Sequence, residues 1–389
     1  MFLNRSVTDT SSGFDFKVFK PATEIAVEKV QKMYPHIKFT TRYVGGYSGC
    51  SGREAIPAAA IAAKEVLEHG TRAFMGPVCT FPLLTVGRMA SYWNIPICTA
   101  GGSGGDLGDK TIFSTLIRVG YNVETVAVAT FKLLQHFLWY HVCLMSDVST
   151  DIEIYYREAL QIEIFQRKNE FTSKVELFDS RSPDFNIAKH LKGCSQVARV
   201  FILMTSYAVV AHILTTAYHL GMGKGEYVFL TRELVSLDIQ LGDLQENYDV
   251  NPVSQILHSL LVVSVQEPEE NEYSKFTQEV LKRSKEEFNI SYNSKAVNMF
   301  VSATHDCVLL YASGLNKTIA EGENPINGRA IAQRVFDSVT EGTSGDLYIN
   351  INGDREPNMV LKDVNKETGV FDFKRGRWTH YCSNNIYVR

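Results

Sequence analysis

Two stretches of the chain carry residue types whose spacing could bind or transform a ligand. In the first, Gly76-Pro77-Val78-Cys79 forms a turn between an expected buried strand at 72–75 and an expected helix at 83–93. Backbone amides at the open start of such a helix favour an anion or a polar ligand group, because the helix dipole and the unpaired N–H groups point at it. In the second, residues 101–105 read Gly-Gly-Ser-Gly-Gly and match the G-x-S-x-G pattern of a serine nucleophile.

The serine of the second stretch, Ser103, is expected to lie in a flexible loop. A nucleophile elbow holds its serine on a sharp turn from a strand into a helix, whereas here a glycine-rich loop and another expected strand at 112–118 follow. An α/β hydrolase that uses Ser103 is therefore the weakest alternative. No metal site is expected from His136 and His141, which are five residues apart, off a shared helical face and without a carboxylate beside them.

Seven cysteines are too few for a disulfide scaffold but enough for one or two bridges. Cys50 and Cys79 fall in loops at the same end of neighbouring strand–helix elements. A bond between them would close a loop of about 30 residues, worth roughly 3 kcal/mol in a chain-entropy model. We predict this pair.

The other five cysteines have no predicted pairing. Cys98, Cys143 and Cys307 lie inside apolar runs, where a buried free cysteine is favoured over a disulfide partner. Cys194 and Cys382 flank surface-like segments, so each is free, paired with the other or bonded between chains. No C-x-x-C pair occurs, and structural zinc is not expected.

The composition is that of an ordinary soluble globular protein. Of 389 residues, 45% are hydrophobic and 21% charged, and the net charge of −4 offers no basic field for nucleic acid. Glycosylation sequons at Asn4, Asn289 and Asn316, together with the paired cysteines, favour an extracellular protein. The first residues do not resemble a signal peptide, and the most apolar stretch, 200–220, is interrupted by histidines and reads as strand and helix rather than a membrane span.

The order of the expected elements indicates an α/β fold. Strands and helices alternate from an expected strand at 37–43 to one at 260–265, and a long helical tract follows, ending in a helix at 328–339. The last segments, such as 345–349, read as short antiparallel strands. Such alternation predicts doubly wound parallel sheets, and the number of strands predicts two lobes.

Several of these segments resemble one family. Gly76-Pro77-Val78-Cys79, Val86-Gly87-Arg88, Gly345-Asp346-Leu347-Tyr348-Ile349 and Asn352-Gly353-Asp354-Arg355-Glu356-Pro357 are similar to stretches of the extracellular ligand-binding domain of natriuretic peptide receptors and of the related receptor guanylyl cyclases of invertebrates. The resemblance covers roughly residues 16 to 382 and is most specific at its two ends.

The resemblance implies a type I periplasmic-binding-protein-like fold of two doubly wound lobes joined by three crossings. Lobe I, membrane-distal, would hold residues 1–116 and 268–342, and lobe II, membrane-proximal, residues 117–267 and 343–389. The family also begins each such lobe with an interior strand before the first helix. Residues 1–16 do not predict that strand, so both it and a signal peptide are expected upstream of this sequence, and a membrane anchor downstream.

The resemblance also assigns roles to individual residues. It implies a structural chloride on the backbone amides of Val78 and Cys79, completed by a serine for which Ser48 is the candidate. It places Phe81 at an aromatic peptide contact and Arg88 at a ligand-pocket arginine, and it supports the Cys50–Cys79 bond. The family's second-lobe disulfide would involve Cys143 and Cys194, but the first lies in an expected strand and the second precedes one.

The function implied is that of a non-catalytic, extracellular binding region of a single-pass receptor, attached to the cell membrane only through a segment outside this sequence. A peptide hormone would bind, and a homodimer would rearrange; no cofactor is expected apart from the chloride. A full-length parent would carry guanylate cyclase activity or belong to the clearance type. The alternative is a small-ligand, amino-acid-type receptor of the same fold, for which Ser103 and Asp106 could offer polar contacts.

Overall fold

The computed structural model describes residues 15–45, 50, 52–120, 122–149, 151–233, 256–266, 270–364 and 371–378. The chain divides into two compact units, which are treated separately below. Unit 1 combines Met1–Asn122 with Glu267–Pro357, and unit 2 combines Val123–Gln266 with Asn358–Arg389. The chain therefore passes between the units three times. Residues 343–357 belong to unit 1 rather than to the second lobe, because they pair with strands of unit 1.

Unit 1 is built on a small parallel sheet. Its strands are β1 (Phe74–Met75), β2 (Ile97–Thr99) and β3 (Leu116–Arg118), in this spatial order. Phe74 pairs with Ile97, and Ile97 with Leu116. The strand, turn, helix and strand expected between 72 and 98 are therefore present.

Two helices cover one face of this sheet, α2 (Ala55–His69) and α3 (Thr80–Trp93). Leu83, Val86 and Ala90, spaced three and four residues apart, form one buried stripe of α3 that packs against α2 and the strands.

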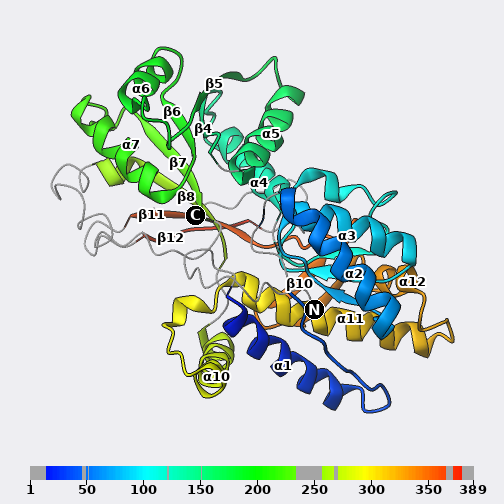
Figure 1. Cartoon of the computed structure of the whole chain (residues 1–389). Coiled ribbons are helices and arrows are strands. Elements are labelled where there is room, and N and C mark those ends of the chain that lie inside the picture. Colours follow the sequence, from blue (N-terminus) through cyan, green and yellow to red (C-terminus); the bar gives the residue numbers. More distant parts are fainter. Residues whose placement is uncertain are drawn as a thin grey trace. The chain divides into compact units, whose positions relative to one another are not determined.

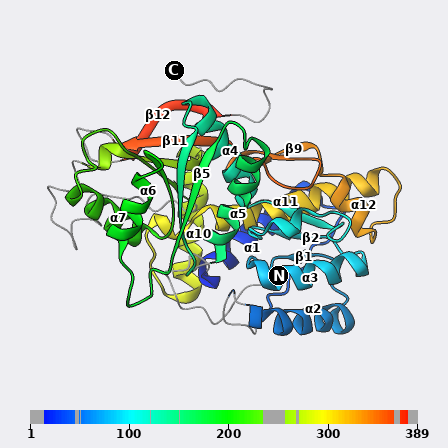
Figure 2. The ribbon, with the colours of Figure 1, turned by 90° about the horizontal axis from the view of Figure 1, so that it is seen from above.

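Two other helices, α1 (Phe16–Met33) and α11 (Met299–Ala320), cover the opposite face (Figure 2). Ala26 and Val30 of α1 pack against Val308, Leu309 and Ala312 of α11 in a separate apolar cluster. Helix α10 (Glu270–Phe288) packs on α1, and α12 (Gly328–Gln333) packs on α11. Single 3-10 turns occur at Gly52–Glu54, Gly105–Gly108 and Ser294–Ala296.

The end of unit 1 corrects one expectation. The helix expected over 328–339 ends at Gln333, and β9 (Ser338–Gly342) follows, paired antiparallel with β10 (Gly345–Ile349). Buried Asp306 of α11 accepts hydrogen bonds from the Thr343 amide at 2.9 Å and the Thr343 hydroxyl at 3.1 Å, which fixes the hairpin turn.

The strand expected over 37–43 is also wrong. The segment is extended, but it forms no named strand, since no described strand pairs with it. The side chain of Gln31, on α1, instead holds this segment through two hydrogen bonds. It accepts from the Phe39 amide at 3.1 Å and donates to the Ile37 carbonyl at 2.8 Å.

Unit 2 has a larger, mixed sheet of seven strands (Figure 1). In spatial order these are β12 (Phe371–Trp378), β11 (Met359–Val364), β8 (Leu260–Val265), β7 (Val228–Glu233), β6 (Val200–Met204), β4 (His141–Asp147) and β5 (Thr172–Phe178). The five strands from β8 to β5 are parallel, and β11 and β12 are antiparallel, as predicted for the chain's end.

Helices lie on both faces of this sheet, as the alternation of elements predicts. Figure 1 shows α6 (Ile187–Ser195) and α7 (Tyr207–His219) on one face and α4 (Val123–His136) and α5 (Asp151–Gln166) on the other. The core beneath α6 and α7 is apolar, and includes Phe201, Leu203 and Phe229 from the strands.

Three disulfides join six of the seven cysteines. Cys50–Cys79, the predicted pair, has a Cα–Cα distance of 5.0 Å. Cys98–Cys307 joins β2 to α11, and Cys143–Cys194 joins β4 to α6, with Cα–Cα distances of 5.5 and 5.6 Å. The preference for free thiols at Cys98, Cys143 and Cys307 is therefore wrong. Each is buried, but each is bonded to a second cysteine on a neighbouring element. Cys382 lies outside the described residues.

Candidate functional site

The turn after β1 is held in place by the neighbouring strand β2. The Gly76–Pro77 peptide bond is cis, and the Gly76 amide donates to the Cys98 carbonyl at 2.7 Å. The Thr99 hydroxyl donates to the Pro77 carbonyl at 2.6 Å and accepts from the Gly101 amide at 3.1 Å. One buried side chain therefore fixes both the turn and the start of the glycine-rich loop.

Helix α3 begins directly after this turn, and its first turn is open. Its N-cap residue, Cys79, has an extended backbone and makes no side-chain cap, because its sulfur is bonded to Cys50. No described residue accepts a hydrogen bond from the amides of Val78, Cys79, Thr80 or Phe81. Successive free amides at a helix start form a concavity that favours an anion.

The glycine-rich loop packs against this helix start. The Gly102 amide donates to the Val78 carbonyl at 3.0 Å, and the Ser103 amide donates to the Thr80 hydroxyl at 3.2 Å. A Cβ atom at Gly101 would overlap the Val78 carbonyl oxygen, so only glycine allows this close approach.

A buried ion pair also holds the glycine-rich loop, and the sequence did not predict this pair. The Arg118 side chain is 2% exposed and donates to both carboxylate oxygens of Asp354, at 2.7 and 2.6 Å. Its remaining amino group donates to the carbonyls of Gly102 and Gly104, each at 3.1 Å. Nothing in the sequence links two residues so far apart, although Asp354 stands in a segment that the family resemblance includes.

Lys110 lies at the edge of this ion pair. Its ammonium is 3.8 Å from Asp354 and donates to the Leu116 carbonyl at 3.1 Å. Burial lowers the pKa of Lys110 to about 8, although the charge of Asp354 acts in the opposite direction.

Phe81 and Arg88, the expected ligand contacts, lie two turns apart on α3. Phe81 is half-buried in the first turn, and Arg88 is exposed. The guanidinium carbon of Arg88 lies 5.7 Å from the centre of the Phe113 ring. Ser48, the candidate third chloride ligand, lies outside the described residues.

Ser103 lacks the setting of a nucleophile. It follows β2 in a loop and precedes a 3-10 turn and β3, so no strand-to-helix elbow is formed. Within the described ranges, no histidine is hydrogen-bonded to its hydroxyl. Asp106 is exposed on the 3-10 turn.

The two described sequons differ in accessibility. Asn289 is exposed just after α10, in a left-handed conformation. Asn316 lies within α11, and the third residue of its sequon, Thr318, is fully buried and donates to the Gly314 carbonyl at 2.8 Å. A glycan is therefore expected at Asn289 and disfavoured at Asn316.

Unit 2 has a polar cluster of its own at the carboxyl ends of its strands. Asp147, at the end of β4, accepts hydrogen bonds from the Ser149 amide at 2.9 Å, the Ser180 amide at 3.3 Å and the Thr205 hydroxyl at 2.9 Å. Burial acts to raise the pKa of Asp147, but these hydrogen bonds outweigh it and hold the pKa below its usual value. Neither a metal-ligating cluster of His, Cys, Asp and Glu nor a helix long and apolar enough to cross a membrane occurs among the described residues.

Comparison with known proteins identifies the family. The model of the receptor family ligand binding region (ANF_receptor) matches residues 18–367. The chain belongs to this family. Atrial natriuretic peptide receptor 3 of Bos taurus is 27% identical over 383 residues, which cover 91% of this chain and 69% of that receptor. Atrial natriuretic peptide receptor 2 of Rattus norvegicus is 26% identical over 356 residues, covering 88% of this chain but 33% of that receptor.

A solved structure shows the fold. The leucine-binding protein LivK of Thermotoga maritima superposes with a TM-score of 0.62 at 16% identity, covering 96% of each chain. The receptor-family domain therefore has the type I periplasmic-binding-protein-like fold that its sequence predicts. It is a ligand-binding domain and not a catalytic one.

Proposed function

We propose that this chain is the extracellular ligand-binding region of a single-pass receptor that binds a peptide hormone and signals by ligand-linked rearrangement of a dimer. The observation that carries the proposal is the family match over residues 18–367, with natriuretic peptide receptors among the relatives. Three disulfides support an oxidising, extracellular location. The parent protein would add a membrane span, and either cyclase domains or a short tail.

A structural chloride at the start of α3 is part of this proposal. Among the described residues, nothing accepts a hydrogen bond from the amides of Val78 and Cys79, which fits an anion there. The disulfide at Cys79 keeps the side chain from capping the helix in its place. The chloride would hold the first turn of α3 and so fix the position of Phe81.

The peptide assignment is tested with fluorescently labelled atrial natriuretic peptide and the purified chain, in chloride buffer and in gluconate buffer. We expect saturable binding that weakens in gluconate. Phe81→Ala and Arg88→Ala should each weaken binding at least about tenfold, as central contacts do. Matched controls are Phe137→Ala and Arg181→Ala in unit 2, whose side chains are exposed and should leave binding unchanged.

Free leucine is the probe for the small-ligand alternative. Saturable leucine binding without peptide binding would replace the peptide assignment by an amino-acid receptor. Binding of neither probe would contradict the proposed ligand classes while leaving the family unaffected.

The dimer is proposed to form through the outer surfaces of α2 and α3. Ile56 and Leu67 of α2 are 79% and 83% exposed, and Tyr92 of α3 is 88% exposed. Ile56 and Leu67 are eleven residues apart and lie on one stripe of the helix. Exposed apolar side chains that gather into one patch mark an interaction surface, and the proposal is that these three residues belong to one such patch.

Sedimentation analysis tests the interface. Leu67→Glu and Tyr92→Glu should each raise the dimer dissociation constant at least about tenfold, because a charge would be buried without a partner. The matched control is Ile162→Glu on α5, another exposed apolar residue (59% exposed). Equal effects of all three changes would argue against this surface.

A further inference from the structure

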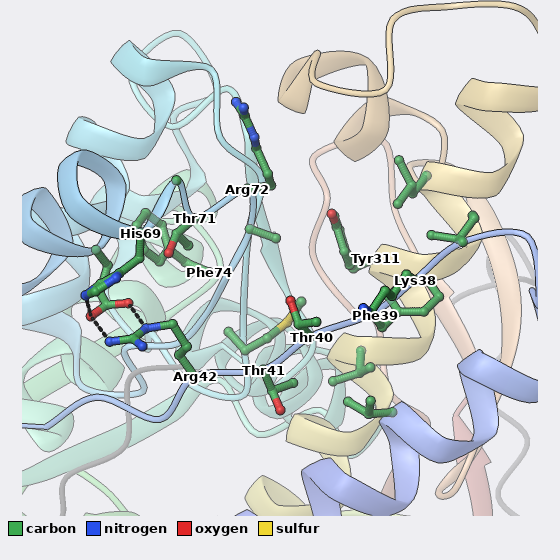
Figure 3. A pocket seen from close by; sticks show the side chains of 18 of the residues that line it. Lys38, Phe39, Thr40, Thr41, Arg42, His69, Thr71, Arg72, Phe74 and Tyr311 are labelled. Carbon is green, nitrogen blue, oxygen red and sulfur yellow. Dashed lines mark hydrogen bonds and ion pairs between the residues drawn. The ribbon is translucent and has the colours of Figure 1, made fainter.

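Two sets of apolar side chains lie outside the candidate site, and they differ in shape. In unit 1, Phe39, Phe74 and Tyr311 line a groove of about 400 Å³ between β1 and the extended segment 38–44, so their side chains face its interior (Figure 3). In unit 2, the turn at 137–140 carries large apolar side chains that are exposed to solvent. A broad surface can therefore contact the second set but not the first.

Two connections of unit 2 lie side by side at one end of its sheet. Residues 137–140 join α4 to β4, and residues 167–171 join α5 to β5. The Thr172 amide donates to the Tyr140 carbonyl at 2.8 Å, and the ring of Phe171 lies 5.2 Å from that of Tyr140. Because β4 and β5 are parallel neighbours, both connections lie at the amino ends of these strands.

Leu138 lies at the turn of the first connection. Helix α4 ends in a Schellman motif, in which the Trp139 amide donates to the Leu134 carbonyl at 2.8 Å. The Leu138 amide donates to the Gln135 carbonyl at 3.1 Å, and Leu138 takes the left-handed position of the motif, with a φ of 57°, where glycine is normally found. Its side chain is 68% exposed, so neither the backbone nor packing accounts for a leucine here. A residue held against its backbone preference often marks a functional site.

Aromatic rings flank Leu138 in the same turn. The Phe137 ring stacks on that of Trp139, with centroids 4.6 Å apart, and is itself 36% exposed. Trp139 and Tyr140 are both partly exposed. Tryptophan and tyrosine have an apolar body and a polar end, and for this reason they favour the boundary between water and lipid.

Helix α5 adds an apolar residue at the same level. The hydroxyl groups of Thr130 on α4 and Tyr156 on α5 are 2.6 Å apart, and the two helices run in the same direction because each leads into a parallel strand. Leu138 and Phe165 follow these two residues by eight and nine positions, so they lie at similar heights along the helix pair. Phe165 is 69% exposed, and the Lys168 ammonium lies 5.4 Å from the centre of its ring.

The charged residues that flank these apolar side chains in sequence have an excess of cations. They are Lys132, Glu163, Arg167, Lys168 and Glu170, of which Arg167 and Glu170 form an ion pair at 3.3 Å. Three cations against two carboxylates leave one positive charge here, whereas the whole chain carries −4. Lysine beside an apolar residue can keep its stem against that residue while its ammonium reaches a lipid phosphate.

We propose that Phe137, Leu138, Trp139, Phe165 and Lys168 form a surface with which unit 2 rests on a phospholipid bilayer, and we call it the bilayer-contact surface. Leu138 and the phenylalanines would enter the boundary of the acyl chains, Trp139 would lie among the headgroups, and Lys168 would reach their phosphates. The apolar turn, the amphipathic rings and the cationic rim follow the order of the layers in a bilayer, which favours lipid over a protein partner. The inference rests on the proposed attachment of this chain to a membrane, and adds direct contact with the lipid.

Vesicle flotation with the purified chain tests the contact. The vesicles contain phosphatidylcholine alone or mixed with phosphatidylserine. We expect weak binding to both, with an association constant in lipid no higher than about 10⁴ M⁻¹, the value for a single myristoyl chain. Phosphatidylserine should strengthen binding about fivefold at low salt, because the surface carries one net positive charge, and high salt should remove this gain.

Leu138→Gly separates a lipid contact from a structural role. Glycine suits the left-handed position, so the melting temperature should stay the same or rise. Vesicle binding should nonetheless fall about tenfold, because no leucine side chain enters the lipid. The matched control is Leu177→Gly, near the other end of the same sheet on β5, where the leucine is 51% exposed; it should leave vesicle binding unchanged.

Trp139 reports the contact independently through its fluorescence. Phosphatidylcholine with brominated acyl chains should quench part of the tryptophan emission of the unchanged chain. Trp139→Phe should remove this quenching, while Trp93 and Trp378 remain as the reference.

Three outcomes would overturn the proposal. The first is neither flotation nor quenching at millimolar lipid, and the second is an equal loss of vesicle binding in L138G and L177G. The third is that L138G abolishes self-association of the chain while the unchanged chain does not bind vesicles, which would assign the surface to a second copy. The peptide-binding and dimer tests are made without lipid, so none of these outcomes decides them.

Discussion

Unit 1 and unit 2 have the same alternation of strands and helices, but they stabilise their sheets by different means. The parallel strands of unit 2 are five to seven residues long and form an extensive ladder. The strands of unit 1 that carry the candidate site are two or three residues long. Short ladders provide few backbone hydrogen bonds, and unit 1 compensates with Arg118–Asp354, Thr99 and two disulfides. The site therefore depends on side chains more than the core of unit 2 does.

The disulfides allow the largest expected effects to be compared. Cys98–Cys307 and Cys143–Cys194 each join a strand to a helix, with sequence separations of 209 and 51. A chain-entropy estimate gives about 5 and about 4 kcal/mol for these separations. Replacing each pair by alanine should therefore destabilise unit 1 more than unit 2, measured as the free energy of unfolding of each unit by hydrogen exchange. An equal or smaller loss in unit 1 would show that its short sheet does not rely on this bond.

Buried polar groups provide the next comparison. Arg118→Met leaves the Asp354 carboxylate without its main partner and should cost about 3–5 kcal/mol in unit 1. Asp147→Asn in unit 2 keeps the volume and removes one acceptor charge, so about 1–3 kcal/mol is expected. Arg118→Lys is the matched control, and because it loses the two-pronged geometry it should recover only part of the stability. If D147N lowered the free energy of unfolding as much as R118M does, the two units would depend equally on their buried polar groups.

The smallest effect is on pH dependence. Lys110 has a folded-state pKa of about 8, below the ordinary value of 10.5, so between these values the unfolded chain binds a proton that the folded chain does not. Stability therefore rises with pH in this window. The free energy of unfolding of the unchanged chain, minus that of Lys110→Met, should become more positive from pH 8 to pH 10. Taking the difference removes the opposing contribution of tyrosines such as Tyr311, whose pKa burial raises.

Local features of the fold could be predicted, and so could one non-local bond. The segment from β1 through α3 to β2 follows from the apolar runs and the Gly-Pro turn that separate its elements. Cys50 and Cys79 could be paired because both lie in loops at the same end of adjacent elements.

Other contacts could not be predicted, because they join distant parts of the chain. Cys98 and Cys307 sit in apolar runs, and a buried thiol and half of a buried disulfide look the same in sequence. The partners Arg118 and Asp354 come from segments on either side of the continuous part of unit 2, Val123–Gln266. The segment 37–43 alternates like a strand, but a strand exists only where a neighbour pairs with it.

Cys98–Cys307 has a topological consequence. Its two cysteines lie in the two separate pieces of sequence that make up unit 1, so the bond closes a covalent ring that contains the whole continuous part of unit 2, Val123–Gln266. A protease that cuts once between Cys194 and Cys307 would open this ring without releasing a fragment. The nicked molecule should migrate as one species without reductant and as two with it, and its site at the start of α3 would remain attached to α11.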